Sequence, residues 1–123
     1  MADSFAYTIS INAVKGTATL PVPAVTTTYA PTGDAYVDVV VAASDSATAL
    51  PVGDIATLKQ VYLRNMSSTS GEWIDLYNDA TKLCRIEPLG QCLLDLEHVT
   101  PANLDIIADT GKTPDCRVII SEK

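Results

Sequence analysis

The sequence has little of the chemistry on which most active sites depend. His98 is the only histidine among 123 residues, and the cysteines, Cys84, Cys92 and Cys116, show no CxxC spacing. Zinc sites need clustered Cys and His ligands at short spacings, so we predict no metal site. A Ser–His or Cys–His pair would have to use His98, whose context, HVTP, indicates a surface loop. We therefore predict that the protein is not an enzyme, has no catalytic residues and binds no cofactor.

The three cysteines are better explained as packing residues. Each lies in a strand-like run, LCRI, QCLLDL or DCRVII. Reduced cysteine behaves as a small hydrophobic residue, so we interpret all three as buried thiols in a reducing compartment. A disulfide would require two of them to meet in space, which their spacing alone does not determine.

Clusters of basic residues and long apolar runs are also absent. The net charge is −7, from 15 acidic and 8 basic residues. Nucleic acids and anionic membranes attract Lys and Arg, so we predict neither as a partner. The longest apolar run, VVVAA at residues 39–43, is too short to cross a bilayer, and the N-terminus lacks the pattern of a secretory signal. We expect synthesis in a cytoplasm.

Alternation with a period of two residues replaces helical periodicity. SFAYTISIN places Phe5, Tyr7, Ile9 and Ile11 on one face, which predicts a half-buried strand. Similar runs recur along the chain, and Pro21 and Pro23 restrict the second of them to a sheet edge or an extended connection. We predict an all-β fold of about eight or nine strands, an antiparallel β-sandwich or barrel of jelly-roll-like type.

The chain length is typical of one domain, so we predict a single β-sandwich over residues 1–123. Residues 1–50 are poorer in charge than the rest, which also fits an N-terminal arm or subdomain. TTTYAPTGD ends in a predicted Pro/Gly turn, and residues 44–57 are predicted to form a long loop.

Residues 58–79, LKQVYLRNMSSTSGEWIDLYND, contain two strand-like runs around a Ser/Thr/Gly turn. We predict that these runs form a hairpin. In the first run Val61 and Leu63 share one face, and Tyr62 and Arg64 lie on the opposite face.

In the second run, Ile74 and Leu76 form the expected core face, so Trp73, Asp75 and Tyr77 point outward. Exposed Trp and Tyr side chains are frequent in subunit interfaces and in ligand platforms. The candidate interface residues are Trp73, Tyr77, Tyr62 and Arg64.

Two apparent motifs in ADTGKTP, residues 108–114, are rejected. A P-loop needs glycine where Ile106 stands, and a following helix that Pro114 opposes. Asp109-Thr110-Gly111 resembles the catalytic turn of retroviral-type aspartic proteases, but too few residues follow it. We interpret this segment as a tight turn in which the glycine takes positive φ.

The acid pairs Asp75/Asp79 and Asp95/Glu97 contain the residue types of glycosidase carboxylates or of a calcium site. Neither has the glycine-punctuated spacing of a calcium loop. We predict that both pairs belong to a solvated face.

Three segments within residues 51–123 carry a family resemblance: VGDIATLKQVYLRNMSS, EWIDLYNDATKLCRIEPLGQCLLDL and NLDIIADTGKTPDCRVIIS. Their order is a Gly-Asp lead-in, a strand ending in Arg64-Asn65, a turn at Pro88–Gly90 and two terminal strands. This pattern resembles small accessory virion proteins of tailed bacteriophages, of the capsid decoration or cement type.

The resemblance implies a non-enzymatic structural protein of the virion. Such a sandwich would form a homo-oligomer, with a trimer favoured, and bind the major capsid protein on the outer capsid surface to stabilise the shell. The alternatives are a tail or head–tail connector component and, from another class, a carbohydrate-binding β-sandwich that uses Trp73, Tyr77 and Tyr62.

Overall fold

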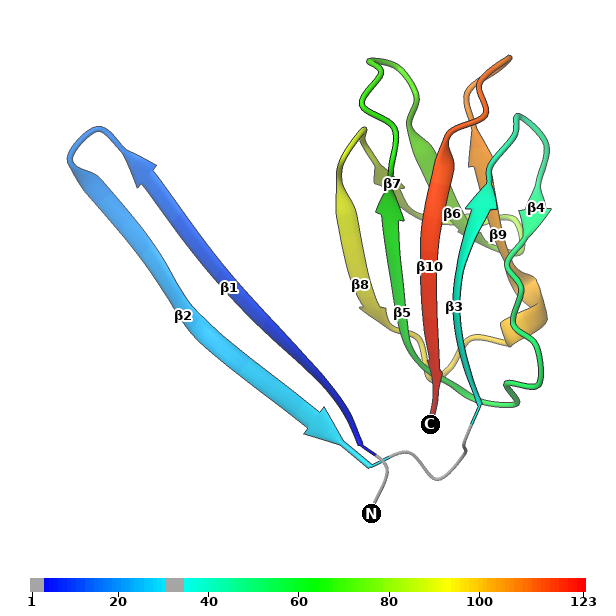
Figure 1. Cartoon of the computed structure of the whole chain (residues 1–123), viewed down its shortest axis with the longest axis horizontal. Helices are drawn as coiled ribbons and strands as arrows, with labels where there is room; N and C mark the ends of the chain where they lie inside the picture. The colour runs from blue at the N-terminus through cyan, green and yellow to red at the C-terminus, as the bar shows by residue number, and fades with distance from the viewer. Residues whose placement is uncertain (1–3, 31–34) are drawn as a thin grey trace. The chain divides into compact units, whose positions relative to one another are not determined.

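The computed structural model of the chain describes residues 4–30 and 35–123, the side chains of residues 12–15 and 18–22 excepted. The chain divides into two compact units, residues 1–32 and residues 33–123. The first contains a two-stranded sheet and the second contains two four-stranded sheets (Figure 1). We call the paired strands of the first unit the ribbon, and residues 35–123 the body. The predicted all-β sandwich is confirmed.

The ribbon consists of β1 (Phe5–Lys15) and β2 (Ala18–Tyr29), paired antiparallel with a register shift between Ile9 and Ile11. A two-residue loop joins them, and its Gly16 has φ 63°, the left-handed conformation that such short hairpin loops require. Both strands of a two-stranded sheet have a free edge. This explains how β2 accommodates two prolines, as the sequence predicted.

The body has eight strands and one short 3-10 helix. In chain order these elements are β3 (Tyr36–Ala42), β4 (Thr48–Ala49), β5 (Leu58–Asn65), β6 (Ile74–Asn78), β7 (Thr81–Ile86), β8 (Gln91–Asp95), η1 (Pro101–Asn103), β9 (Leu104–Ala108) and β10 (Asp115–Glu122). Sheet I has the order β3-β10-β5-β8, and sheet II has the order β4-β9-β6-β7. Across the described part of the chain, no helix is long and apolar enough to cross a membrane.

The strand pairing follows a nested pattern. The antiparallel pairs include β3 with β10, β4 with β9, β5 with β8, and β6 with β7. The chain therefore runs as a doubled strand pair that wraps around the core, which is the topology of a jelly roll. Within the body only β6 and β7 are consecutive strands of the same sheet. Every other connection passes from one sheet to the other.

The predicted hairpin of residues 58–79 is wrong. β5 lies in sheet I between β10 and β8, whereas β6 lies in sheet II between β9 and β7. Residues 66–73 cross between the sheets. Alternation along a strand determines which face is buried, but it does not determine which strand lies alongside.

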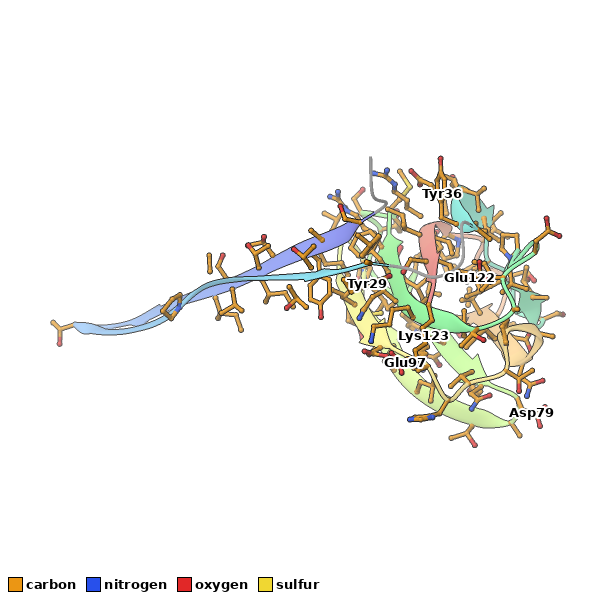
Figure 2. All side chains as sticks on the ribbon, turned by 90° about the horizontal axis from the view of Figure 1, so that it is seen from below. Tyr29, Tyr36, Asp79, Glu97, Glu122 and Lys123 are labelled. Atoms are coloured by element: carbon orange, nitrogen blue, oxygen red, sulfur yellow. The ribbon has the colours of Figure 1, made fainter. Side chains whose placement is uncertain are left out.

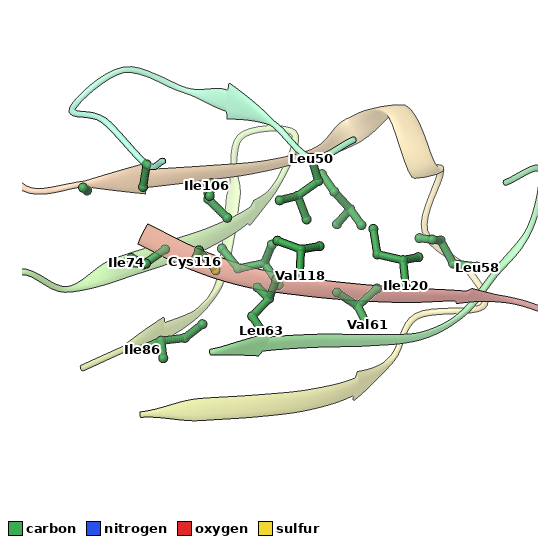
Figure 3. Close-up of a cluster of buried hydrophobic side chains, with 14 of the residues drawn as sticks. Leu50, Leu58, Val61, Leu63, Ile74, Ile86, Ile106, Cys116, Val118 and Ile120 are labelled. Carbon is green, nitrogen blue, oxygen red and sulfur yellow. The ribbon is translucent and has the colours of Figure 1, made fainter. Parts of the chain in front are cut away.

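The core lies between the two sheets (Figure 3). Its fully buried apolar side chains are Leu58, Val61, Leu63, Ile74, Leu76, Leu104, Ile106, Cys116, Val118 and Ile120. The inward faces predicted for the segments that became β5 and β6 are confirmed by this burial. Each such side chain contributes about 1.5–3 kcal/mol relative to exposure.

The connections agree in part with the sequence. Residues 43–57 contain only the two-residue strand β4, as expected for a loop-like region. The tight turn at residues 109–111 is confirmed: Gly111 has φ 74°, and the Thr110 amide donates to Asp109 Oδ1 at 2.8 Å. The turn predicted at Pro31–Gly33 lies outside the described residues.

Candidate interaction surfaces

The outer face of sheet II holds the first pair of candidate interface residues. Trp73 and Tyr77 are half-buried on the side opposite Ile74 and Leu76, as predicted. Asp75 lies between them on the same face but is only 2% exposed, so its predicted place on a solvated face is wrong. The strand pairing explains the difference, because long basic side chains on β7 cover the carboxylate.

Asp75 is held by two cations. Arg85, its cross-strand partner, donates from Nε to Oδ1 at 2.8 Å and from Nη2 to Oδ2 at 3.0 Å. Lys82 Nζ lies 3.3 Å from Oδ2. Burial is the largest single influence and raises the pKa of Asp75, but the hydrogen bonds from Arg85 and Lys82 together outweigh it. The net result is a pKa below the ordinary value of 3.8.

Arg85 also covers the indole ring of Trp73. Its Cζ atom lies 3.7 Å from the ring centroid, a cation–π contact. A sugar that stacks on Trp73 would meet this guanidinium on the ring face that Arg85 occupies. Trp73, Arg85 and Asp75 therefore form one connected cluster on the surface of sheet II.

The second pair of candidates, Tyr62 and Arg64, lies on the outer face of sheet I. The Tyr62 hydroxyl donates to Gln91 Oε1 at 2.8 Å, and Arg64 is exposed. The four candidates thus divide between the two opposite outer faces of the sandwich. A single platform that combines Tyr62 with Trp73 and Tyr77 does not form.

Sheet I also presents residues that were not selected from the sequence. Tyr36 (Figure 2) is 75% exposed and Val40 is 56% exposed, and both belong to the edge strand β3. Nearby, Arg117 donates to Asp38 from Nε at 3.2 Å and from Nη2 at 3.1 Å. Each of the two sheets therefore carries an arginine–aspartate pair on its outer face.

The acid pair Asp95 and Glu97 converges on one cation. Lys59 Nζ lies 3.1 Å from Asp95 Oδ2 and also pairs with Glu97, which in turn binds Lys123 at 3.3 Å (Figure 2). Both carboxylates keep solvent contact, as predicted. His98, in the following turn, is exposed, also as predicted.

Asn65, from the motif Arg64-Asn65, holds the loop between β5 and β6. The Asn65 side chain is fully buried, and its Nδ2 donates to Glu72 O at 2.7 Å and to Ile86 O at 3.1 Å. Its Oδ1 accepts from the Ser67 amide at 3.0 Å. The asparagine at the end of this strand is therefore explained by its three hydrogen bonds to the backbone of the protein itself.

The ribbon has one apolar face and one polar face. The apolar face carries Phe5, Tyr7, Ile9, Ile11, Val25 and Tyr29, together with Thr27, the partner of Tyr7. The polar face carries Ala6, Thr8, Ser10, Thr26 and Thr28, with a hydrogen bond of 2.6 Å between the hydroxyls of Thr8 and Thr26. Phe5 and Tyr29 pack with ring centroids 5.4 Å apart.

The apolar face of the ribbon is far from covered. Ile9 is 48% exposed, Ile11 is 55% exposed and Val25 is 60% exposed. The prediction that this face of the strand is buried is therefore wrong for Ile9 and Ile11. Lys15 is the only charged residue between positions 4 and 33. Together these facts describe a surface of low charge with an exposed apolar stripe.

The cysteines differ from one another. Cys116 is fully buried, as predicted, while Cys84 and Cys92 are only half-buried and their sulfur atoms lie 3.8 Å apart. No three His, Cys, Asp or Glu residues gather into a possible metal site within the described ranges. No protein-family model matches the chain, and neither the curated proteins nor the solved structures contain a match to it.

Proposed function

We propose that the protein is a non-enzymatic structural subunit of a virion, a capsid decoration or cement protein. Its body would lie on the outer capsid surface, against the major capsid protein, and its ribbon would pack on a neighbouring subunit. The observation that carries this proposal is the exposed apolar face of the ribbon, in a segment whose only charged residue is Lys15.

A two-stranded ribbon gains little stability from itself. Isolated two-stranded hairpins are marginal in water unless an apolar face is covered. Ile9, Ile11 and Val25 each keep about half of their surface exposed. Burying the remainder would contribute on the order of 1 kcal/mol for each side chain, or about 3 kcal/mol in total. That energy corresponds to roughly a hundredfold change in affinity.

The composition of the ribbon indicates the kind of surface it fits. With Lys15 as its only charge, the ribbon can use one counter-charge and offers at most one phosphate contact. An apolar protein surface satisfies it, either on another copy of this chain or on a shell subunit. Exchange of ribbons between neighbouring copies would give the closed homo-oligomer, a trimer, that the family resemblance implies.

The fold supports the proposal only in a general way. Jelly rolls include viral capsid domains, but also lectins and cupins, so fold alone does not identify a function. The carbohydrate-binding alternative is weakened by the position of Tyr62, which lies on the opposite face from Trp73 and Tyr77, and by Arg85, which stacks on the indole of Trp73.

A matched pair of variants tests the role of the ribbon. Ile9→Asp and Ser10→Asp introduce the same charge at adjacent positions on opposite ribbon faces. We expect Ile9→Asp to reduce both self-association, measured by light scattering at micromolar concentration, and co-sedimentation with capsids. Ser10→Asp should retain both. Equal behaviour of the two variants, or a wild-type monomer that does not bind capsids, would refute the proposal.

Cross-linking of intact particles locates the ribbon's partner. Lys15 is the only lysine before Lys59, so an amine-reactive reagent can link the ribbon at that one side chain. We expect links from Lys15 to the major capsid protein or to a second copy of this chain. Absence of the chain from purified particles would contradict the virion assignment directly.

A further inference from the structure

We propose that Cys84 and Cys92 form a reversible oxidation site, at which a disulfide links sheet I to sheet II along one edge of the sandwich. The observation that carries this inference is the position of the two thiols on facing edge strands, with their sulfur atoms 3.8 Å apart. The inference does not depend on the proposed capsid function.

The jelly-roll topology brings the two cysteines together. β7 is an edge strand of sheet II, and β8 is an edge strand of sheet I. Cys84 is the cross-strand partner of Leu76, and Cys92 is the partner of Leu63. Both leucines are fully buried, so both cysteines point inward, toward each other, at the open edge between the sheets.

Only a small movement separates the thiols from a covalent bond. A disulfide has a sulfur–sulfur distance of about 2.05 Å, so the sulfur atoms must approach by about 1.8 Å from their present 3.8 Å. The intervening turn is itself held in place: the Leu89 amide donates to Ser67 O, and Gly90 O accepts from the Asn65 amide, both at 2.9 Å. The fold therefore keeps the pair close without a bond between them.

The two thiols have different roles in the exchange reaction. The hydrogen bond with Cys92 lowers the pKa of Cys84 to about 7, although burial and the charge of Asp75 oppose this change. A thiol whose pKa is close to the ambient pH is the most effective attacking group in thiol–disulfide exchange. The hydrogen bond with Cys84, together with burial, raises the pKa of Cys92. Because their shared contact favours a thiolate on one member of the pair, we assign Cys84 as the attacking thiol and Cys92 as the thiol that resolves the intermediate.

The oxidant is a low-molecular-weight disulfide such as oxidised glutathione. The Cys84 thiolate attacks one of its sulfur atoms, the glutathione disulfide bond breaks, and one glutathione thiolate leaves. Cys92 then loses its proton to water and attacks Cys84 Sγ, which releases the second glutathione. The protein loses two electrons and two protons, and glutathione disulfide is reduced to two glutathione molecules.

Cys116 provides an internal control. It is fully buried, and burial raises the pKa of its thiol to about 11. It should remain reduced while the other two cysteines react, because a thiol needs both exposure and thiolate character to be oxidised.

The test is to titrate the folded full-length protein with mixtures of reduced and oxidised glutathione. The samples are then quenched by alkylation in denaturant and analysed by intact mass spectrometry. The reduced protein should take three alkyl groups, one for each free cysteine, and the oxidised protein should take one. Cys116→Ala should oxidise like the wild type, whereas Cys84→Ser and Cys92→Ala should form no internal disulfide.

A second measurement separates preorganisation by the fold from mere proximity in sequence. The same equilibrium is measured in urea, where the chain is unfolded. We expect the equilibrium constant for formation of the Cys84–Cys92 disulfide to be at least tenfold larger in the folded protein than in the unfolded chain. An equal or smaller constant in the folded protein, a disulfide that involves Cys116, or a glutathione adduct on Cys84 that does not resolve would each overturn the proposal.

Discussion

Replacement of Asn65 by alanine should strongly destabilise the body. The Asn65 side chain is fully buried and makes three hydrogen bonds, to Glu72 O, Ile86 O and the Ser67 amide. Alanine would leave these three backbone groups without that partner. A hydrogen bond contributes about 0.5–1.5 kcal/mol net, so the expected loss is about 3 kcal/mol.

The position of each group refines this estimate. Ile86 O is buried and would have no substitute, whereas Glu72 O and the Ser67 amide are only partly buried and can recruit water when the loop relaxes. We therefore expect a loss of about 2–4 kcal/mol in the free energy of unfolding. For a domain of this size that loss corresponds to a decrease in Tm of roughly 10–20 °C.

Urea unfolding provides the measurement. Trp73 is the only tryptophan and is the last residue of the loop that Asn65 holds, so its fluorescence reports on the relevant region. Asn103→Ala is the matched control because the Asn103 side chain is exposed, and it should change stability by less than about 0.5 kcal/mol. If the two variants have the same stability, the hydrogen bonds of Asn65 do not hold this loop.

Three further predictions concern the other contacts of the body. Because the folded pKa of Asp75 lies below its ordinary value of 3.8, the stability from this carboxylate is present above that value and is lost as the pH falls through the folded pKa. Acid titration should therefore destabilise the wild type more than Asp75→Asn, and an identical pH profile of the two proteins would contradict the ion pairs. Trp73→Ala should lower the free energy of unfolding of the body by about 1–2 kcal/mol, because the cation–π contact and packing are lost. If Trp73 is also an interface anchor, as the sequence predicts, the same variant should lose about 2 kcal/mol in the free energy of association, measured by light scattering. Gly90→Ala should destabilise the body by about 1–3 kcal/mol, because the added Cβ would lie 2.8 Å from the backbone oxygen of Glu87; unchanged thermal unfolding would show that the turn can relax.

The sequence was sufficient to predict strands and their buried faces. Alternation placed Val61 and Leu63 inward on β5, and Ile74 and Leu76 inward on β6, and all four are fully buried. This information is local, because each residue's face depends only on its position along its own strand.

The sequence was not sufficient to predict which strands are neighbours. The eight residues from 66 to 73 can close a hairpin or cross between sheets, and both outcomes bury the same side chains. Two errors follow from this one ambiguity. The sequence predicts a common face for Tyr62 and Trp73, but they lie on opposite faces of the sandwich. It also predicts a solvated Asp75, because it does not reveal that Arg85 on β7 is the cross-strand partner. The proximity of Cys84 to Cys92 is likewise a result of topology.

The distribution of charge distinguishes the possible contact surfaces. The outer face of each sheet carries an arginine–aspartate pair, Arg85 with Asp75 and Arg117 with Asp38. Arg85, Arg117 and Asp38 are each about half exposed, so a partner that covers either face must remove at least one of these ions from water, and desolvation can exceed the electrostatic gain. The ribbon has one charged residue, Lys15, and burial of its exposed apolar side chains Ile9, Ile11 and Val25 is favourable. Association through the ribbon therefore has the smaller opposing energy. For this reason the ribbon, rather than the cluster around Trp73, is the surface we expect to drive assembly.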